Sequence, residues 1–255
     1  MVADPPIIEV KGLTAAYGDF VLLEGVTFNV RRGEVFVILG GSGCGKSTLL
    51  KHMIGLLPPA AGEILIDGGN IGTATGKERA ALLSKFGVMY QSGALFGSLT
   101  LAENVMLALE EFTCLPRDAR ELVARMKLSL VGLDKFCSHF PSEVSGGMQK
   151  RAAIARAMAL DPAVLFLDEP SAGLDPVTSA GLDDLVHNLN RHLGVTFVIV
   201  SHEMPSIYAI ADRVIMLDQS TKGIIAEGAP AFLRDNDTNP FVHAFFHREA
   251  REANP

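Results

Sequence analysis

The stretch Gly40-Gly41-Ser42-Gly43-Cys44-Gly45-Lys46-Ser47 decides the fold of this chain. It matches the pattern G-x-x-x-x-G-K-S/T at every fixed position. The apolar run Val35–Leu39 precedes it, and Thr48 with two following leucines can start a helix. Glycines let successive backbone N–H groups turn toward an anion, and a helix N-terminus adds positive partial charge. The sequence therefore predicts a strand, a phosphate-binding loop and a helix, and it disfavours the alternative of a glycine-rich turn that binds nothing.

Two side chains of this loop have predicted roles. The ammonium of Lys46 would pair with β- and γ-phosphate oxygens, and the hydroxyl of Ser47 would bind Mg²⁺. The loop residues expected to contact a nucleotide are Gly40, Gly41, Ser42, Gly43, Cys44, Gly45, Lys46, Ser47 and Thr48.

A second candidate centre is acidic. The apolar run Val164–Leu167 is followed directly by Asp168 and Glu169. Open α/β sheets place their ligands at the carboxyl ends of strands, where these two acids would lie. Asp168 is expected to hold Mg²⁺, and Glu169 to orient or deprotonate an attacking water. Taken alone, the pair could equally be a strand end that caps the next helix.

Alternating strand and helix signals surround these motifs. Residues from about 91 to 160 have mostly helical patterns, which indicates a helical insertion between strands. The predicted class is α/β with a mainly parallel sheet. β-branched runs predict strands at Ile7–Val10, Val26–Val30, Val35–Leu39, Ile64–Ile66, Val88–Tyr90, Val164–Leu167, Val195–Val200 and Val214–Leu217. Helix signals are Thr100 with Glu103, Pro116 before a stop at Gly132, and Asp175-Pro176 before a stop at Gly194.

Composition narrows the function classes. The chain has 255 residues, and 22 Lys and Arg against 29 Asp and Glu give a net charge of −7, so no nucleic-acid partner is expected. The longest apolar runs are far shorter than the roughly 18 residues of a membrane span. The amino terminus, Met1–Pro6, lacks the pattern of a secretory signal. Cys44, Cys114 and Cys137 form no CxxC pair, which indicates a reducing cytosol without disulfides or zinc.

The segment Val144-Ser145-Gly146-Gly147-Met148-Gln149 adds a family resemblance. Together with the two motifs above, it resembles the nucleotide-binding subunit of an ABC transporter, from about residue 7 to about residue 235. The resemblance implies the ABC ATPase fold: a P-loop NTPase core, an antiparallel β subdomain and a helical subdomain. It also implies ATP and Mg²⁺ as cofactors. The implied division is a core with β subdomain at 1–90 and 161–235, a helical subdomain at 91–160, and a C-terminal tail at 236–255.

The resemblance assigns further residues. Tyr17 matches an aromatic that stacks on adenine, although alone it reads as an ordinary half-buried strand residue. Gln91 matches a glutamine that senses Mg²⁺ and the γ-phosphate. His202 matches a switch histidine, although alone it could cap a helix near Met204. Ser171–Asp175 matches a loop that touches the other nucleotide site.

The resemblance also implies a dimer. Ser145, Gly146 and Gly147 would offer a hydroxyl and bare amides to an ATP bound by a second copy, so that two copies close head-to-tail around two ATPs. Met148 departs from the family's usual glutamine. Because Ser145 and the glycines make the phosphate contacts, activity should survive this departure.

Two strings indicate a subfamily. The strings from Gln91 to Phe96 and from Ser145 to Arg151 resemble ATPases of the Mla/Mce type, which drive phospholipid traffic. The implied location is peripheral, on the cytoplasmic face of the bacterial inner membrane. Implied partners are permease subunits docked near Gln91–Leu99, a small regulatory subunit and an Mce-type lipid-binding protein. Leu95, Phe96 and Leu99 would line that dock, or they could be core residues of the insertion.

Rival readings are an ATPase of another ABC importer family and a non-transport ABC ATPase in DNA repair or translation. The absence of a heptad run between Lys46 and Asp168 disfavours the repair class. Two local questions remain open at this level. The helix terminus beside Cys44 could lower the pKa of its thiol, or Cys44 could be merely tolerated. The tail from Asn239 predicts a short helix that packs on its own chain, on a second copy or on a partner.

Overall fold

The computed structural model describes residues 5–249. The predicted amino-terminal and tail features that fall on residues 1–4 and 250–255 lie outside this range. The chain forms two compact units: residues up to Gly72 together with those from Val198 onward, and residues Thr73–Phe197. The predicted subdomain boundaries stay a prediction.

The first unit contains an antiparallel sheet with the strand order β2-β1-β4-β5. One of its two inner strands is β1, in which Ile8 lies opposite Val30 of β2 and Ile66 of β4, and all three side chains are buried. Buried and exposed positions alternate over Val26–Val30 of β2, as a sheet with one covered face requires. The strands are β1 (Ile8–Tyr17), β2 (Phe20–Val30), β4 (Ala61–Ile66) and β5 (Gly69–Asn70).

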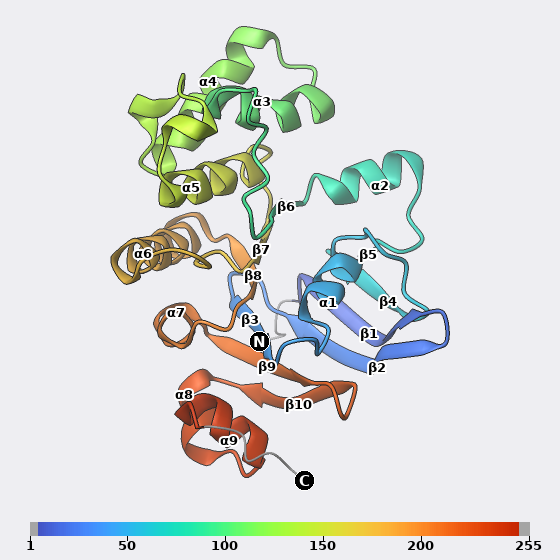
Figure 1. Cartoon of the computed structure of the whole chain (residues 1–255). Helices are drawn as coiled ribbons and strands as arrows, with labels where there is room; N and C mark the ends of the chain where they lie inside the picture. Colours follow the sequence, from blue (N-terminus) through green and yellow to red (C-terminus); the bar gives the residue numbers. More distant parts are fainter. Residues whose placement is uncertain (1–4, 250–255) are drawn as a thin grey trace. The chain divides into compact units, whose positions relative to one another are not determined.

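The first unit also holds the strand that leads into the glycine-rich loop. Every residue of β3 (Val35–Gly40) is buried, as predicted for a central strand, and β3 pairs in parallel with β9. Figure 1 shows α8 and α9 beside β10 in this unit. Its other elements are α1 (Lys46–Met53), α7 (Met204–Ile210), β9 (Arg213–Asp218), β10 (Gly223–Gly228), α8 (Pro230–Asn236) and α9 (Pro240–His247).

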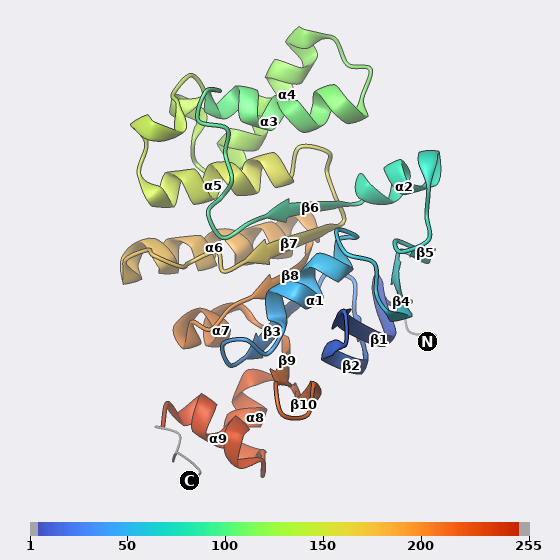
Figure 2. The same cartoon turned by 45° about the vertical axis from the view of Figure 1, so that its right-hand side comes forward.

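In the first unit, β10, β9 and β3 lie side by side in that order, and β8 (Thr196–Val200) falls at the boundary between the two units in the sequence. In the second unit, β6 (Phe86–Met89) and β7 (Val164–Asp168) run parallel and side by side, with α5 packed on β6 (Figure 2). The helices α3, α4 and α5 pack on one another. The helices of this unit are α2 (Gly76–Leu83), α3 (Leu101–Phe112), α4 (Arg117–Leu130), α5 (Gly146–Ala157) and α6 (Pro176–Leu193), with short 3₁₀ turns at Asp134–Phe136 and Pro141–Glu143.

Most helix signals are confirmed. Thr100 and Glu103 form both hydrogen bonds of a capping box at the start of α3. Asp175 accepts hydrogen bonds from the backbone N–H groups of the first turn of α6, and Gly194 ends that helix at a φ of 68°. The prediction that Pro116 is the first helical residue is wrong by one position. Its ψ of 160° is extended, as in a capping residue, so α4 begins at Arg117.

None of the helices described between residues 5 and 249 is long and apolar enough to cross a membrane. The predicted C-terminal helix is present as α9. Its residues Val242 and Phe246 are buried in the first unit, and the ring of Phe246 contacts the ring of Tyr208. Within the described range, this tail therefore packs on its own chain.

Candidate functional site

The phosphate loop joins β3 to α1. The Lys46 ammonium donates hydrogen bonds to the carbonyl oxygens of Gly40 and Gly41 at 2.9 and 3.0 Å. This contact folds the lysine back over the loop from which it comes. Ser47, one residue further into α1, is exposed. A cation and a hydroxyl are thus held at the start of a helix, where an anion is favoured.

Two glycines allow the loop to close so tightly. Gly40 has a φ of 145°, and a Cβ there would lie 2.5 Å from both Cys44 Sγ and the Leu217 carbonyl oxygen. Gly45 has a φ of 101°, which side chains disfavour, and a Cβ would come within 3.2 Å of Leu23. The loop conformation therefore requires glycine at both positions.

Tyr17 and His202 belong to the same unit as this loop. Tyr17 ends β1 with 52% of its surface exposed, and its hydroxyl lies 3.4 Å from Thr48 Oγ1. Tyr17 is thus a half-buried residue at the end of a strand, and its predicted role in stacking on adenine stays a prediction. His202 follows β8 and is exposed, with Nε2 3.6 Å from Glu203 Oε1. The residue at the N-cap of α7 is Glu203, so His202 does not cap that helix.

The environment of Cys44 differs from the one that would lower the pKa of its thiol. Its side chain is buried, and this burial is the largest influence on the thiol, whose pKa it raises. Lys46 opposes the shift but does not reverse it. The hypothesis that the helix terminus lowers the pKa of Cys44 is therefore wrong, because loss of water around a thiolate outweighs the nearby positive charge.

The raised pKa predicts slow alkylation. At pH 8, a thiol whose pKa lies above its usual value holds little thiolate, and burial also blocks the reagent. We expect iodoacetamide to label Cys44 at least about tenfold more slowly than the exposed Cys114, as followed by peptide mass spectrometry. Equal labelling rates for the two cysteines in the folded chain would contradict the buried position of Cys44.

The acidic pair ends β7 in the second unit. The four residues before Asp168 are buried, and Asp168 itself is partly exposed. Glu169 is 8% exposed and has a φ of 47°, a left-handed conformation that L-residues rarely adopt. The backbone thus turns sharply after the strand and holds the Glu169 carboxylate in a mostly buried position.

The segment at Ser145 forms the start of α5. The Ser145 hydroxyl accepts a hydrogen bond from the Met148 backbone N–H at 3.3 Å, and Ser145 and Gly146 are exposed. Gly147 is buried, and a Cβ there would lie 2.4 Å from Thr178 Cγ2 of α6. Gly147 therefore lets the two helices approach, a packing role that the sequence analysis did not assign.

Gln91 follows β6 and is tied to α5 by a residue that the sequence analysis did not single out. The Lys150 ammonium donates a hydrogen bond to the Gln91 carbonyl oxygen. Further along, Arg156 donates hydrogen bonds to the carbonyl oxygens of Ala94 and Gly93 at 2.6 and 2.8 Å. No local sequence pattern signals these contacts, because the carbonyl acceptors lie 59, 62 and 63 residues away in the chain.

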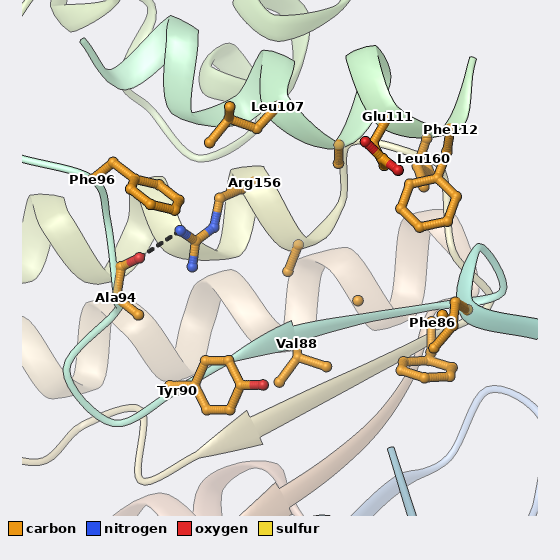
Figure 3. Close-up of a pocket in the computed structure, with 14 residues that line it drawn as sticks. Phe86, Val88, Tyr90, Ala94, Phe96, Leu107, Glu111, Phe112, Arg156 and Leu160 are labelled. Atoms are coloured by element: carbon orange, nitrogen blue, oxygen red, sulfur yellow. Dashed lines mark hydrogen bonds between the residues drawn. The ribbon is translucent and has the colours of Figure 1, made fainter. Parts of the chain in front are cut away.

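A cavity of about 520 Å³ lies in the second unit, between β6, α3 and the end of α5 (Figure 3). Its wall is largely apolar and aromatic, and Arg156 reaches across it to Ala94. Phe96 is 56% exposed, which fits a binding surface better than a core. The lining residues are Leu83, Phe86, Gly87, Val88, Tyr90, Ala94, Phe96, Leu107, Ala108, Glu111, Phe112, Arg156, Ala157 and Leu160.

The predicted site residues thus fall into two sets. The first unit contains Tyr17, the loop at 40–48 and, after β8, His202, and of these Tyr17 contacts the loop through Thr48. The second unit contains Gln91, Ser145–Gly147, Asp168 and Glu169.

A family model described as "ABC transporter" matches residues 23–172. The chain is 42% identical over 240 residues to the "Probable ribonucleotide transport ATP-binding protein mkl" of Mycobacterium leprae, covering 94% of this chain and 68% of that protein. The Mycobacterium tuberculosis H37Rv protein of the same name is 41% identical and covered to 66%. The chain thus spans about two thirds of these mycobacterial relatives.

Two further relatives are covered more fully. The "Intermembrane phospholipid transport system ATP-binding protein MlaF" of Haemophilus influenzae is 41% identical, covering 87% of this chain and 83% of that protein. The Escherichia coli K12 protein of the same name is 38% identical, with 94% and 88% covered.

The chain is also similar to solved structures of ATP-binding cassettes. A dimeric ATP-binding cassette, MJ0796, bound to ADP and Pi, has a TM-score of 0.77 and 30% identity, covering 87% of this chain and 98% of that one. The cbiO1 subunit from Clostridium perfringens, part of the transporter complex cbiONQ, has a TM-score of 0.83 and 30% identity, with 91% and 92% covered.

Proposed function

Because this chain belongs to the ABC transporter family and is an ATP-binding and ATP-hydrolysing subunit of such a transporter, we propose that it drives phospholipid transport between membranes. The observation that carries the proposal is its similarity to the two MlaF relatives over most of both chains. The mycobacterial relatives named for ribonucleotide transport favour a second candidate cargo. Since this chain spans only about two thirds of their length, they support that cargo less directly.

The proposed catalytic roles follow from the chemistry of the side chains. Lys46 pairs with phosphate oxygens in exchange for the carbonyls of Gly40 and Gly41. Glu169 orients the attacking water and accepts its proton, and His202 bridges a phosphate oxygen to the neighbouring loop. Tyr17 offers an exposed aromatic face to adenine.

Mg²⁺ fits the proposed donor set. The Ser47 hydroxyl, the Gln91 side-chain amide and the Asp168 carboxylate are all oxygen ligands, which this hard cation prefers. Mg²⁺ in nucleotide sites uses one or two carboxylates together with substrate phosphates, so a single aspartate is sufficient. When bound, it supplies charge stabilisation for the phosphoryl group.

We also propose a head-to-tail dimer. The MJ0796 cassette is described as dimeric in its solved structure. The exposed Ser145 and Gly146 at the start of α5 suit an anion from a second copy, since a helix N-terminus carries free N–H groups. ATP then holds the two copies together, and hydrolysis releases them.

The cavity of the second unit is the proposed dock for a permease helix. Its volume and its apolar lining suit the apolar face of an amphipathic helix. Within the segment from Gln91 to Leu99, Ala94 and the exposed Phe96 line this cavity, whereas the predicted Leu95 and Leu99 do not. Such docking would hold the chain peripherally at the cytoplasmic face of the bacterial inner membrane, where a small regulatory subunit and an Mce-type lipid-binding protein complete the proposed complex.

Affinity purification from detergent-solubilised membranes tests the cargo. A tagged chain should co-purify with a permease and an Mce-type protein, and mass spectrometry of the complex should find bound phospholipid. Enrichment of ribonucleotides other than ATP and ADP, or co-purification with a periplasmic sugar- or amino-acid-binding protein, would contradict phospholipid transport.

The Phe96→Asp variant tests the dock in the same purification. A carboxylate in an apolar interface costs several kcal/mol, so we expect at least a tenfold loss of permease recovery. ATP binding by the isolated chain should stay within about twofold of the parent, because Phe96 is exposed. Glu78→Gln, at an exposed position in α2, serves as the control for recovery. Full permease recovery with Phe96→Asp would exclude this surface as the dock.

A further inference from the structure

Lys150 is a buried cation that none of the roles above uses. It lies in the second turn of α5, and it is only 8% exposed. Its ammonium donates a hydrogen bond to the carbonyl oxygen of Gln91, the residue that follows β6 and Tyr90. Because the Gln91 side chain extends from the same residue, the lysine helps to fix where that side chain starts.

The same ammonium is under the influence of both carboxylates at the end of β7. Burial is the largest influence on Lys150 and lowers its pKa, while Asp168 and Glu169 act in the opposite direction. Taking a cation out of water costs several kcal/mol unless partners compensate. The hydrogen bond to the Gln91 carbonyl and the two carboxylates offset part of that cost, and the pKa of Lys150 stays below its usual value.

Lys127 in α4 shows what a buried lysine with a structural role looks like in this chain. It is 1% exposed, and its ammonium pairs with Asp161 in the turn before β7. Asp161 has no proposed part in catalysis. The two buried lysines therefore form a natural comparison. Lys127 forms an ion pair with a structural carboxylate, whereas Lys150 is hydrogen-bonded to Gln91 and is influenced electrostatically by the proposed catalytic carboxylates.

We infer that Lys150 is a positioning residue for ATP hydrolysis, which holds the backbone at Gln91 and offsets the negative charge of Asp168 and Glu169. This inference rests on the proposed function of those three residues. ATP carries about four negative charges at neutral pH, so two uncompensated carboxylates would repel it. With Lys150 present, nucleotide can approach before its charge is fully neutralised by Mg²⁺.

The inference predicts opposite shifts in two measurements. Without the ammonium, the carboxylates repel metal-free ATP more strongly, so its affinity falls by about tenfold. The same excess of negative charge attracts Mg²⁺, so the Mg²⁺ concentration for half-maximal ATPase activity falls by about threefold to tenfold. Loss of the Gln91 contact lowers kcat. A merely structural role would lower stability and activity without making Mg²⁺ more effective.

The experiment uses Lys150→Met, which removes the charge and keeps the apolar stem. Affinity for trinitrophenyl-ATP is measured in EDTA, and ATPase activity is titrated with Mg²⁺. Lys127→Met is the matched control, which should lower the thermal midpoint but leave both nucleotide measurements within about twofold of the parent, because its partner is Asp161. Lys150→Arg should restore metal-free binding.

Unchanged metal-free affinity in Lys150→Met, or the same shifts in Lys127→Met, would overturn the inference. If Lys150→Met does not fold, Lys150→Gln is compared in the parent and in a Glu169→Gln background, where the effect on metal-free binding should shrink to about threefold. Equal effects in both backgrounds would also overturn the inference. If the parent chain itself neither binds nor hydrolyses ATP, the proposed function fails instead.

Discussion

Glu169→Gln is expected to lower ATP turnover by about 10²- to 10⁴-fold while leaving ATP binding intact. The amide has the shape of the carboxylate but cannot accept the proton of the attacking water, and general-base catalysis contributes about this factor. Since hydrolysis is what separates the proposed dimer, the variant should accumulate as an ATP-bound dimer. Phosphate release measures turnover, and light scattering coupled to size-exclusion chromatography measures the dimer.

The control for this variant is Glu78→Gln, which makes the same chemical change at an exposed position in α2. It should hydrolyse ATP at the parent rate and stay monomeric after turnover. Parent-level hydrolysis by Glu169→Gln would show that another residue activates the water. Slow hydrolysis without an ATP-dependent dimer would retain the catalytic role but contradict the coupling of hydrolysis to dissociation.

Lys46→Ala is expected to weaken ATP binding by about a hundredfold. The ammonium lies in the phosphate loop within 3.0 Å of two carbonyl oxygens. Charge-assisted hydrogen bonds to phosphate contribute about 1.5–3 kcal/mol each, and alanine removes them together. Isothermal titration with ATP and Mg²⁺ measures the affinity, and turnover should fall with it.

Lys51→Ala is the matched control for Lys46→Ala. Lys51 lies in the same helix, α1, but its side chain is exposed in the last turn. The Lys51→Ala substitution removes the same charge as Lys46→Ala. It therefore separates a general electrostatic effect on ATP affinity from the loss of a direct contact with phosphate. Equal ATP affinities for the parent and Lys46→Ala would refute the phosphate-loop assignment.

The sequence predicted the parts of the fold where local signals are strong. Buried parallel strands such as Val35–Gly40 are continuous apolar runs, and caps such as Asp175 act within one turn. β10 was not predicted, because Gly223–Gly228 is bounded by glycines and is only partly buried. β1 is longer than predicted, because Gly12, at a φ of 60°, and register shifts break its alternation.

The candidate site shows the same division. Contiguous motifs at the ends of strands predicted roles for Lys46, Ser47, Asp168 and Glu169. The roles of Lys150 and Arg156 depend on carbonyl oxygens 59 and 62 residues away, so no local pattern shows them. The direction of the pKa shift of Cys44 could not be predicted either, because burial in the folded chain decides it.

At Glu169, the left-handed backbone lowers the stability of the fold, whereas the proposed catalytic role requires a glutamate there. A non-glycine residue at a φ of 47° costs roughly 1 kcal/mol that glycine would not. Directed evolution of this chain for heat resistance alone would therefore reward glycine at position 169 and remove the proposed base in the same step. A thermostabilisation campaign on this protein needs a turnover assay at every round, because its best-folded descendants at this position would be inert.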